Sequence, residues 1–120
     1  MGLDMMLIHN VDEWNEVGYW RKANAIHKWF VDNVQNGVDD CGEYKVTKEQ
    51  LIQLRDECNQ VLNDSSLAES LLPTFPGFFF GGIEYNDRYV VDLENTVKII
   101  DEIINDKPYC LDDLYYSSSW

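Results

Sequence analysis

The chain has 120 residues, of which 45% are hydrophobic and 13% aromatic, so it can bury one core, and wholesale disorder is excluded. Its 22 acidic residues outnumber its 9 basic residues and give a net charge of −13, which disfavours binding to DNA, RNA or an anionic membrane surface. No uncharged apolar run approaches the roughly 20 residues that a membrane span needs.

The first part of the chain predicts strands around one helix. Residues 3–9 are short and apolar and predict a buried strand. Residues 11–19 are acidic and aromatic, and Gly18 would interrupt any helix there. The helical period of apolar residues predicts a helix over residues 20–36, which ends at an Asn–Gly pair. Residues 43–46 could then form a short strand.

Two further helices are expected in the middle of the chain. Thr47 and Gln50 have the spacing of a capping box, which predicts that a helix begins here. That helix should fade at the Asn–Asp pair at residues 63–64. A short third helix is expected over residues 65–72, with Pro73 beyond its end.

The last third of the chain predicts a strand, a long helix and a final strand. Three phenylalanines at residues 78–80 suit a buried strand, and Gly81 and Gly82 should border a pocket. A helix over residues 87–106 can be capped by the preceding Asn or by its own first Asp. Its expected apolar face consists of Val90, Leu93, Val97, Ile100 and Ile104. The aromatic residues of segment 109–120 predict an ordered final strand.

These elements predict a single α+β domain over residues 1–120, with a small, mainly antiparallel sheet covered by about three helices. Helices and strands are mixed without a regular βαβ alternation, which argues against a parallel sheet. In such folds the first and last strands often pair at the centre of the sheet, and the same pairing is expected here.

The three cysteines, Cys41, Cys58 and Cys110, are expected to be small buried hydrophobes in a reducing cytosol. Their number is odd, and none forms a C-x-x-C pair. A zinc site that adds His9 or His27 to these thiols has no sequence signature. No metal and no cofactor are therefore expected.

A candidate ligand-binding site lies in the block EVGYWRKANAIHKWF, residues 16–30. On the predicted helix, residues 20, 24 and 27 would share one face, and the two cations would lie at its N-terminus, where backbone N–H groups bind anions. An aromatic ring would stack on a planar ligand, cations would neutralise phosphate, and polar side chains would form directional hydrogen bonds. The candidate residues are Tyr19, Trp20, Arg21, Lys22, Asn24 and His27.

The same residues also fit a purely structural interpretation. Trp20 and Trp29 could be core residues, and Arg21 could pair with a nearby acid such as Glu16. A single histidine on a mostly apolar helix face is more often a hydrogen-bonded core residue than a catalytic base, and this applies to His27. The block therefore predicts a ligand-binding site, and a purely structural role for the same residues remains the alternative.

The acidic residues lie in pairs along the whole chain and match no calcium-binding loop, P-loop or dinucleotide fingerprint. They are usually a solvated surface. A sharper hypothesis is an acidic surface that mimics DNA and occupies the nucleic-acid channel of a target protein.

Four segments together resemble a family of small, mostly uncharacterised proteins of bacteriophages and prophages. They are MGLDM, then EVGYWRKANAIHKWF with DDCGEY, then LLPTFPGFFFG, and finally YYSSSW. The combination spans nearly the whole chain. The resemblance implies a phage accessory protein that acts in the host bacterial cytoplasm, and it does not name a reaction.

The leading functional hypothesis is a non-enzymatic counter-defence or host-takeover protein that binds a nucleotide-like anion, with no catalytic residue. Tyr19 or Trp20 would stack on the base, Arg21 and Lys22 would neutralise phosphate, and the polar side chains further along would complete the site. The alternative is an acidic, anti-CRISPR-type inhibitor of a host defence protein. A third hypothesis is a small nucleotide-acting enzyme with His27 as its base.

Overall fold

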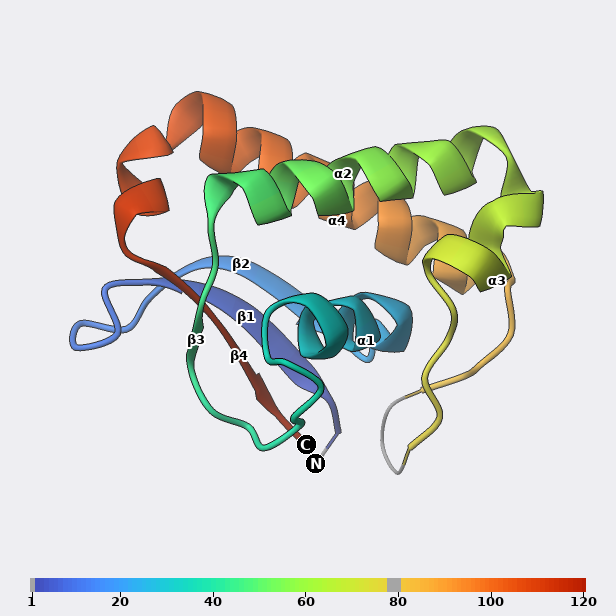
Figure 1. Cartoon of the computed structure of the whole chain (residues 1–120), viewed down its shortest axis with the longest axis horizontal. Helices are drawn as coiled ribbons and strands as arrows, with labels where there is room; N and C mark the ends of the chain where they lie inside the picture. Colours follow the sequence, from blue (N-terminus) through green and yellow to red (C-terminus); the bar gives the residue numbers. More distant parts are fainter. Residues whose placement is uncertain (1, 78–80) are drawn as a thin grey trace.

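The computed structural model describes residues 2–77 and 81–120 and shows one α+β globule. Its sheet contains β1 (Asp4–His9), β2 (Asn15–Arg21), β3 (Tyr44–Lys45) and β4 (Leu114–Ser119), in the order β2-β1-β4-β3 (Figure 1). Every pair of neighbouring strands is antiparallel. The predicted fold class is confirmed.

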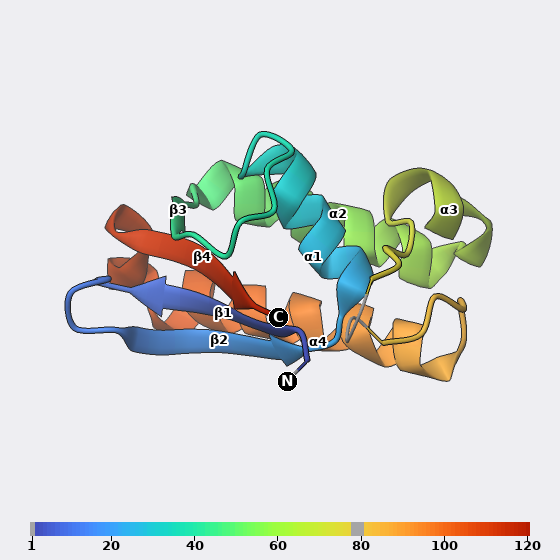
Figure 2. The same ribbon diagram turned by 90° about the horizontal axis from the view of Figure 1, so that it is seen from below.

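The first and last strands pair at the centre of the sheet, as expected from the sequence. The register runs from Asp4 opposite Ser119 to His9 opposite Leu114. Figure 2 shows β1, β2 and β4 side by side, with no helix drawn across their near face. The ordered C-terminal strand is confirmed, although it begins at Leu114 and follows a 3₁₀ turn, Pro108–Asp112.

The helix predicted over residues 20–36 is wrong at its start, because residues 15–21 form β2. Burial alternates along this strand: Gly18 and Trp20 face the core, while Tyr19 and Arg21 are exposed. Helix α1 spans only Asn24–Asn33. Pairing of β2 with β1 supplies the backbone hydrogen bonds of this segment, and this tertiary contact overrides the local helical period.

Gly18 has a packing role that the sequence does not reveal. A Cβ added at Gly18 would lie 2.8 Å from Cγ2 of Ile99, on α4 (Asp87–Asp106). The glycine therefore allows α4 to approach the sheet closely. It does not mark the end of a helix.

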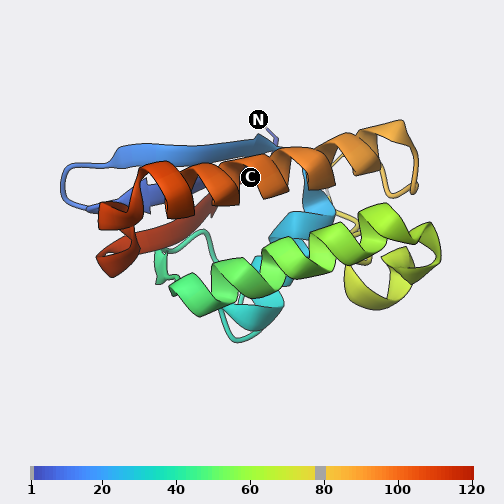
Figure 3. The same cartoon turned by 90° about the horizontal axis from the view of Figure 1, so that it is seen from above.

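The two long helices lie on one side of the sheet (Figures 1 and 3). Helix α2 (Lys48–Asn63) begins with the predicted capping box, and the Asn86 side chain caps α4 by accepting a hydrogen bond from the backbone N–H of Tyr89. The buried face of α4 includes the predicted Leu93 and Ile100, whereas Val90 is 41% exposed and does not belong to it.

The remaining helical segments connect these layers. The predicted short third helix is present as a 3₁₀ turn, Ser65–Leu67, followed by α3 (Ala68–Leu71). Helix α1 packs on β4 through Phe30 and Tyr116, whose rings stack with centroids 3.9 Å apart. The strand predicted at residues 78–80 lies outside the described residues. Among the described residues, no helix has the length and apolar character required to cross a bilayer.

Candidate functional site

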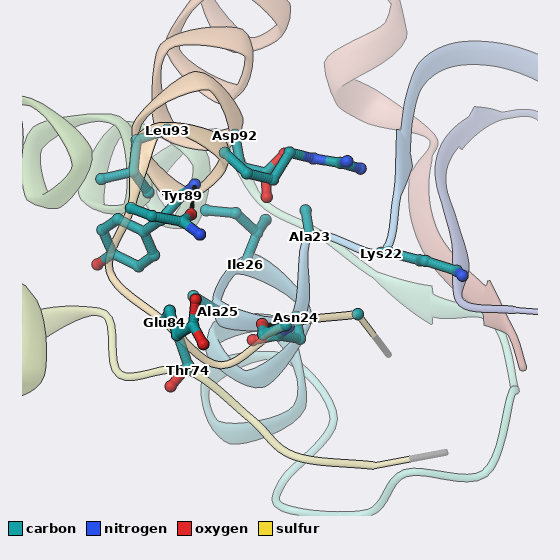
Figure 4. Close-up of a pocket in the computed structure, with 14 residues that line it drawn as sticks. Lys22, Ala23, Asn24, Ala25, Ile26, Thr74, Glu84, Tyr89, Asp92 and Leu93 are labelled. Atoms are coloured by element: carbon teal, nitrogen blue, oxygen red, sulfur yellow. Dashed lines mark hydrogen bonds and ion pairs between the residues drawn. The ribbon is translucent and has the colours of Figure 1, made fainter. Parts of the chain in front are cut away.

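A pocket of about 140 Å³ lies where the chain enters α1 and α4, and we call it the α1–α4 pocket (Figure 4). It is formed by two stretches that are far apart in the sequence: the start of α1, and the loop before α4 together with the first turns of α4. Its wall consists of Lys22, Ala23, Asn24, Ala25, Ile26, Thr74, Gly81, Gly82, Glu84, Asn86, Arg88, Tyr89, Asp92 and Leu93.

The first turns of two helices contribute to this pocket. Residues 23–26 of its wall are the start of α1, whose N-cap residue, Ala23, offers no side-chain cap. Asn86, Arg88 and Tyr89 belong to the start of α4. Helix N-termini carry a partial positive charge, and α1 has no acidic residue in its first turn, so its start favours a negatively charged ligand group. The start of α4 is capped by Asn86 and carries Asp87 in its first turn, which offsets its partial charge.

Charged side chains of both signs line the same pocket. Lys22 has a left-handed backbone with φ of 58°, and its side chain extends away from Tyr89 and Glu84 (Figure 4). Arg88 donates from Nη2 to the backbone carbonyl of Arg21 at 3.1 Å. The wall also contains the carboxylates of Glu84 and Asp92. The pocket therefore does not attract anions uniformly.

Asn24 fixes the loop that forms one wall of the pocket. Its Nδ2 donates to the carbonyl of Gly82 at 2.7 Å, and its Oδ1 accepts from the backbone N–H of Phe75 at 2.9 Å. Gly81, with φ of 89°, packs against Lys22, since an added Cβ would lie 3.1 Å from the Lys22 Cβ. The prediction that Gly81 and Gly82 border a pocket is confirmed.

The structure does not bring the six predicted ligand-binding residues together. Lys22 and Asn24 line the α1–α4 pocket. Trp20 is only 2% exposed, and its Nε1 donates to Oγ1 of Thr96 at 2.8 Å inside the core. Trp20 therefore cannot offer its ring to a ligand from solution, and this proposed role is corrected.

Tyr19 and Arg21 belong to a different surface. Both donate to Oδ1 of Asp4, the Tyr19 hydroxyl at 2.5 Å and the Arg21 Nη1 at 2.7 Å. Tyr19 also borders a separate hollow between β2 and α4, whose lining shares no residue with the α1–α4 pocket. Arg21 does pair with an acidic residue, as the structural interpretation proposed, but its partner is Asp4 and not Glu16.

His27 is a buried core residue, as the structural interpretation proposed. Its side chain is 0% exposed, with Nδ1 2.6 Å from the Tyr116 hydroxyl and Nε2 3.0 Å from Oδ1 of Asp39. Burial lowers the pKa of His27 despite the nearby Asp39 carboxylate, which favours the neutral ring. The neutral ring then donates from Nε2 to Asp39 and accepts at Nδ1 from Tyr116. It is not positioned to act on a ligand in the pocket.

The sequence did not predict that α4 contributes Arg88, Tyr89 and Asp92 to the pocket wall. The cap at Asn86 predicted where α4 begins, but no local pattern connects this point with the start of α1 more than 60 residues earlier. Burial raises the pKa of Asp92 to about 6, while Arg88 acts in the opposite direction. Such a perturbed carboxyl in a cleft is typical of a functional site.

Comparison with protein-family models, curated proteins and solved structures gives no match for this chain. Within the described residues, no group of three or more histidine, cysteine or acidic side chains could hold a metal ion.

Proposed function

We propose that this protein binds a nucleotide-like small molecule in the α1–α4 pocket. The observation that carries the proposal is that the first turns of two helices, together with Lys22 and Arg88, line a single pocket. These groups suit a phosphate or another anionic group. The protein acts by capturing this ligand, because the only histidine of the predicted site is buried in the core.

The size of the pocket supports partial enclosure of the ligand. Pockets that enclose a whole drug-sized ligand usually measure about 300–1,000 Å³. A volume of about 140 Å³ holds one part of a nucleotide, such as the edge of a base or a phosphate. The rest of the ligand lies at the rim, where the Lys22 side chain extends away from Tyr89 (Figure 4).

The resemblance to phage and prophage proteins implies where this binding would act, namely in an infected bacterial cell. A phage accessory protein in the bacterial cytoplasm that sequesters a nucleotide would remove a signal or a substrate from a host defence protein. The net charge of −13 keeps such a protein away from nucleic acids, so the free nucleotide is the expected ligand.

The proposal is tested by calorimetric titration with AMP and GMP. Wild-type protein should bind at least one of them, and Lys22→Gln should weaken that binding about fivefold to tenfold, the scale of one charge-assisted contact at a partly exposed site. The matched control is Arg21→Gln, which removes the neighbouring cation that pairs with Asp4 outside the pocket. It should change affinity less than about twofold.

Two results would contradict the proposal. One is the absence of binding of either nucleotide to wild-type protein at millimolar concentration. The other is an equal loss of affinity in Arg21→Gln and Lys22→Gln, which would place the ligand on the sheet surface around Asp4.

A further inference from the structure

Asp92 is a poorly compensated carboxylate in the wall of the α1–α4 pocket. Its side chain is 21% exposed, and the nearest cation, Nε of Arg88, lies 3.6 Å from Oδ1. The two side chains form an ion pair, but this separation is longer than a usual N–H···O hydrogen bond. Arg88 also directs Nη2 to the carbonyl of Arg21, at 3.1 Å, and so holds part of its guanidinium away from the carboxylate.

The surroundings of Asp92 explain its raised pKa. Burial raises the pKa of this carboxyl to about 6, so the group is still mainly ionised at pH 7.5. A half-buried carboxylate that lacks full compensation is stabilised by a ligand that donates hydrogen bonds to it. Figure 4 shows Asp92 reaching the pocket from α4, while Glu84 approaches from the preceding loop.

We propose that Asp92 is a specificity-determining residue that accepts hydrogen bonds from an N–H edge of the bound base. The inference rests on the proposed function and names the class of nucleotide. A carboxylate has two oxygen acceptors and pairs best with two adjacent N–H donors. Among the purine bases, guanine presents this edge, hypoxanthine presents one of the two donors, and adenine lacks the ring N–H. The preferred ligand is therefore a guanine nucleotide.

The test compares GMP with IMP, which differ only by the exocyclic amine. Wild-type protein at pH 7.5 should bind GMP about tenfold more tightly than IMP, the usual effect of one hydrogen bond to a charged acceptor. In Asp92→Asn the preference should fall to about threefold or less. Glu94→Gln, which neutralises an exposed acid on the same helix, is the matched control and should keep the wild-type preference.

The pH dependence of the preference gives a second readout. The other charged or titratable side chains of the described pocket wall are Lys22, Glu84, Arg88 and Tyr89. Protonation of Asp92 below pH 6 removes an acceptor, so the ratio of GMP to IMP affinity should fall between pH 7.5 and pH 5 in wild-type protein. The same change of pH should leave the ratio of Asp92→Asn nearly constant.

Equal affinity of wild-type protein for GMP, IMP and AMP would overturn this inference and leave the proposed function intact. A preference for GMP that survives in Asp92→Asn and is lost in Glu84→Gln would also overturn it, because the acceptor would then be Glu84. Failure of all three nucleotides to bind would reject both proposals.

Discussion

Replacing Ile100 by Asp should lower the free energy of unfolding by at least about 4 kcal/mol. Ile100 is 0% exposed and lies in the central core, on the buried face of α4. An aspartate at this position would either remain as an unpaired buried charge or be protonated at a cost, and it would also lose the apolar contacts of isoleucine. Urea denaturation measures the effect.

The matched control for Ile100→Asp is Val91→Asp on the same helix. Val91 is 54% exposed, so an aspartate there remains hydrated and should change stability by less than about 1 kcal/mol. Equal urea midpoints for Ile100→Asp and wild-type protein would contradict the position of α4 in the core.

Replacing His27 by Ala should lower the free energy of unfolding by about 3–5 kcal/mol. The change leaves a cavity and removes the acceptor of the buried Tyr116 hydroxyl, which lies 2.6 Å from Nδ1. It also removes the donor that lies 3.0 Å from Asp39. A buried hydroxyl without a partner accounts for about 1–3 kcal/mol of this loss.

A double-mutant cycle with Tyr116→Phe separates these contributions. If the hydroxyl and the ring form one hydrogen bond, the double variant should be more stable than the sum of the single effects predicts, by about 1 kcal/mol or more. Strict additivity would show that His27 and Tyr116 contribute independently, against the geometry of the pair.

The helix and strand pattern was predictable where local chemistry determines it. The capping box at Thr47 and Gln50 marks the start of α2, and the Asn86 cap marks the start of α4. The pairing of β1 with β4 was also expected from their places in the chain. At these positions the local preference and the tertiary packing agree.

The predicted helix began too early, at residue 20, and no strand was predicted over residues 15–21, because two periodicities meet at Trp20. Trp20 and Ala23, three residues apart, fit a helical stripe, yet the buried positions of the strand are Gly18 and Trp20, two residues apart. The neighbouring strand β1 decides between the two patterns. Only the tertiary contact between Gly18 and Ile99 explains why a glycine occupies this strand.

The candidate site was predictable only in part, because it forms from segments that are distant in the sequence. Lys22 and Asn24 were chosen for their place near a helix start, and both line the pocket. Arg88 and Asp92 belong to α4 and become neighbours of Lys22 only through folding. Trp20 and His27 were chosen for their chemistry, and the core accounts for both.

The most direct test of the central claim is a titration of ¹⁵N-labelled protein with GMP, followed by amide chemical shifts. Binding in the α1–α4 pocket predicts that the largest shifts occur at Asn24, Ala25 and Gly82 and at Tyr89 in the first turn of α4. Saturable shifts confined to the sheet surface around Asp4, or no saturable shift at millimolar GMP, would contradict the claim.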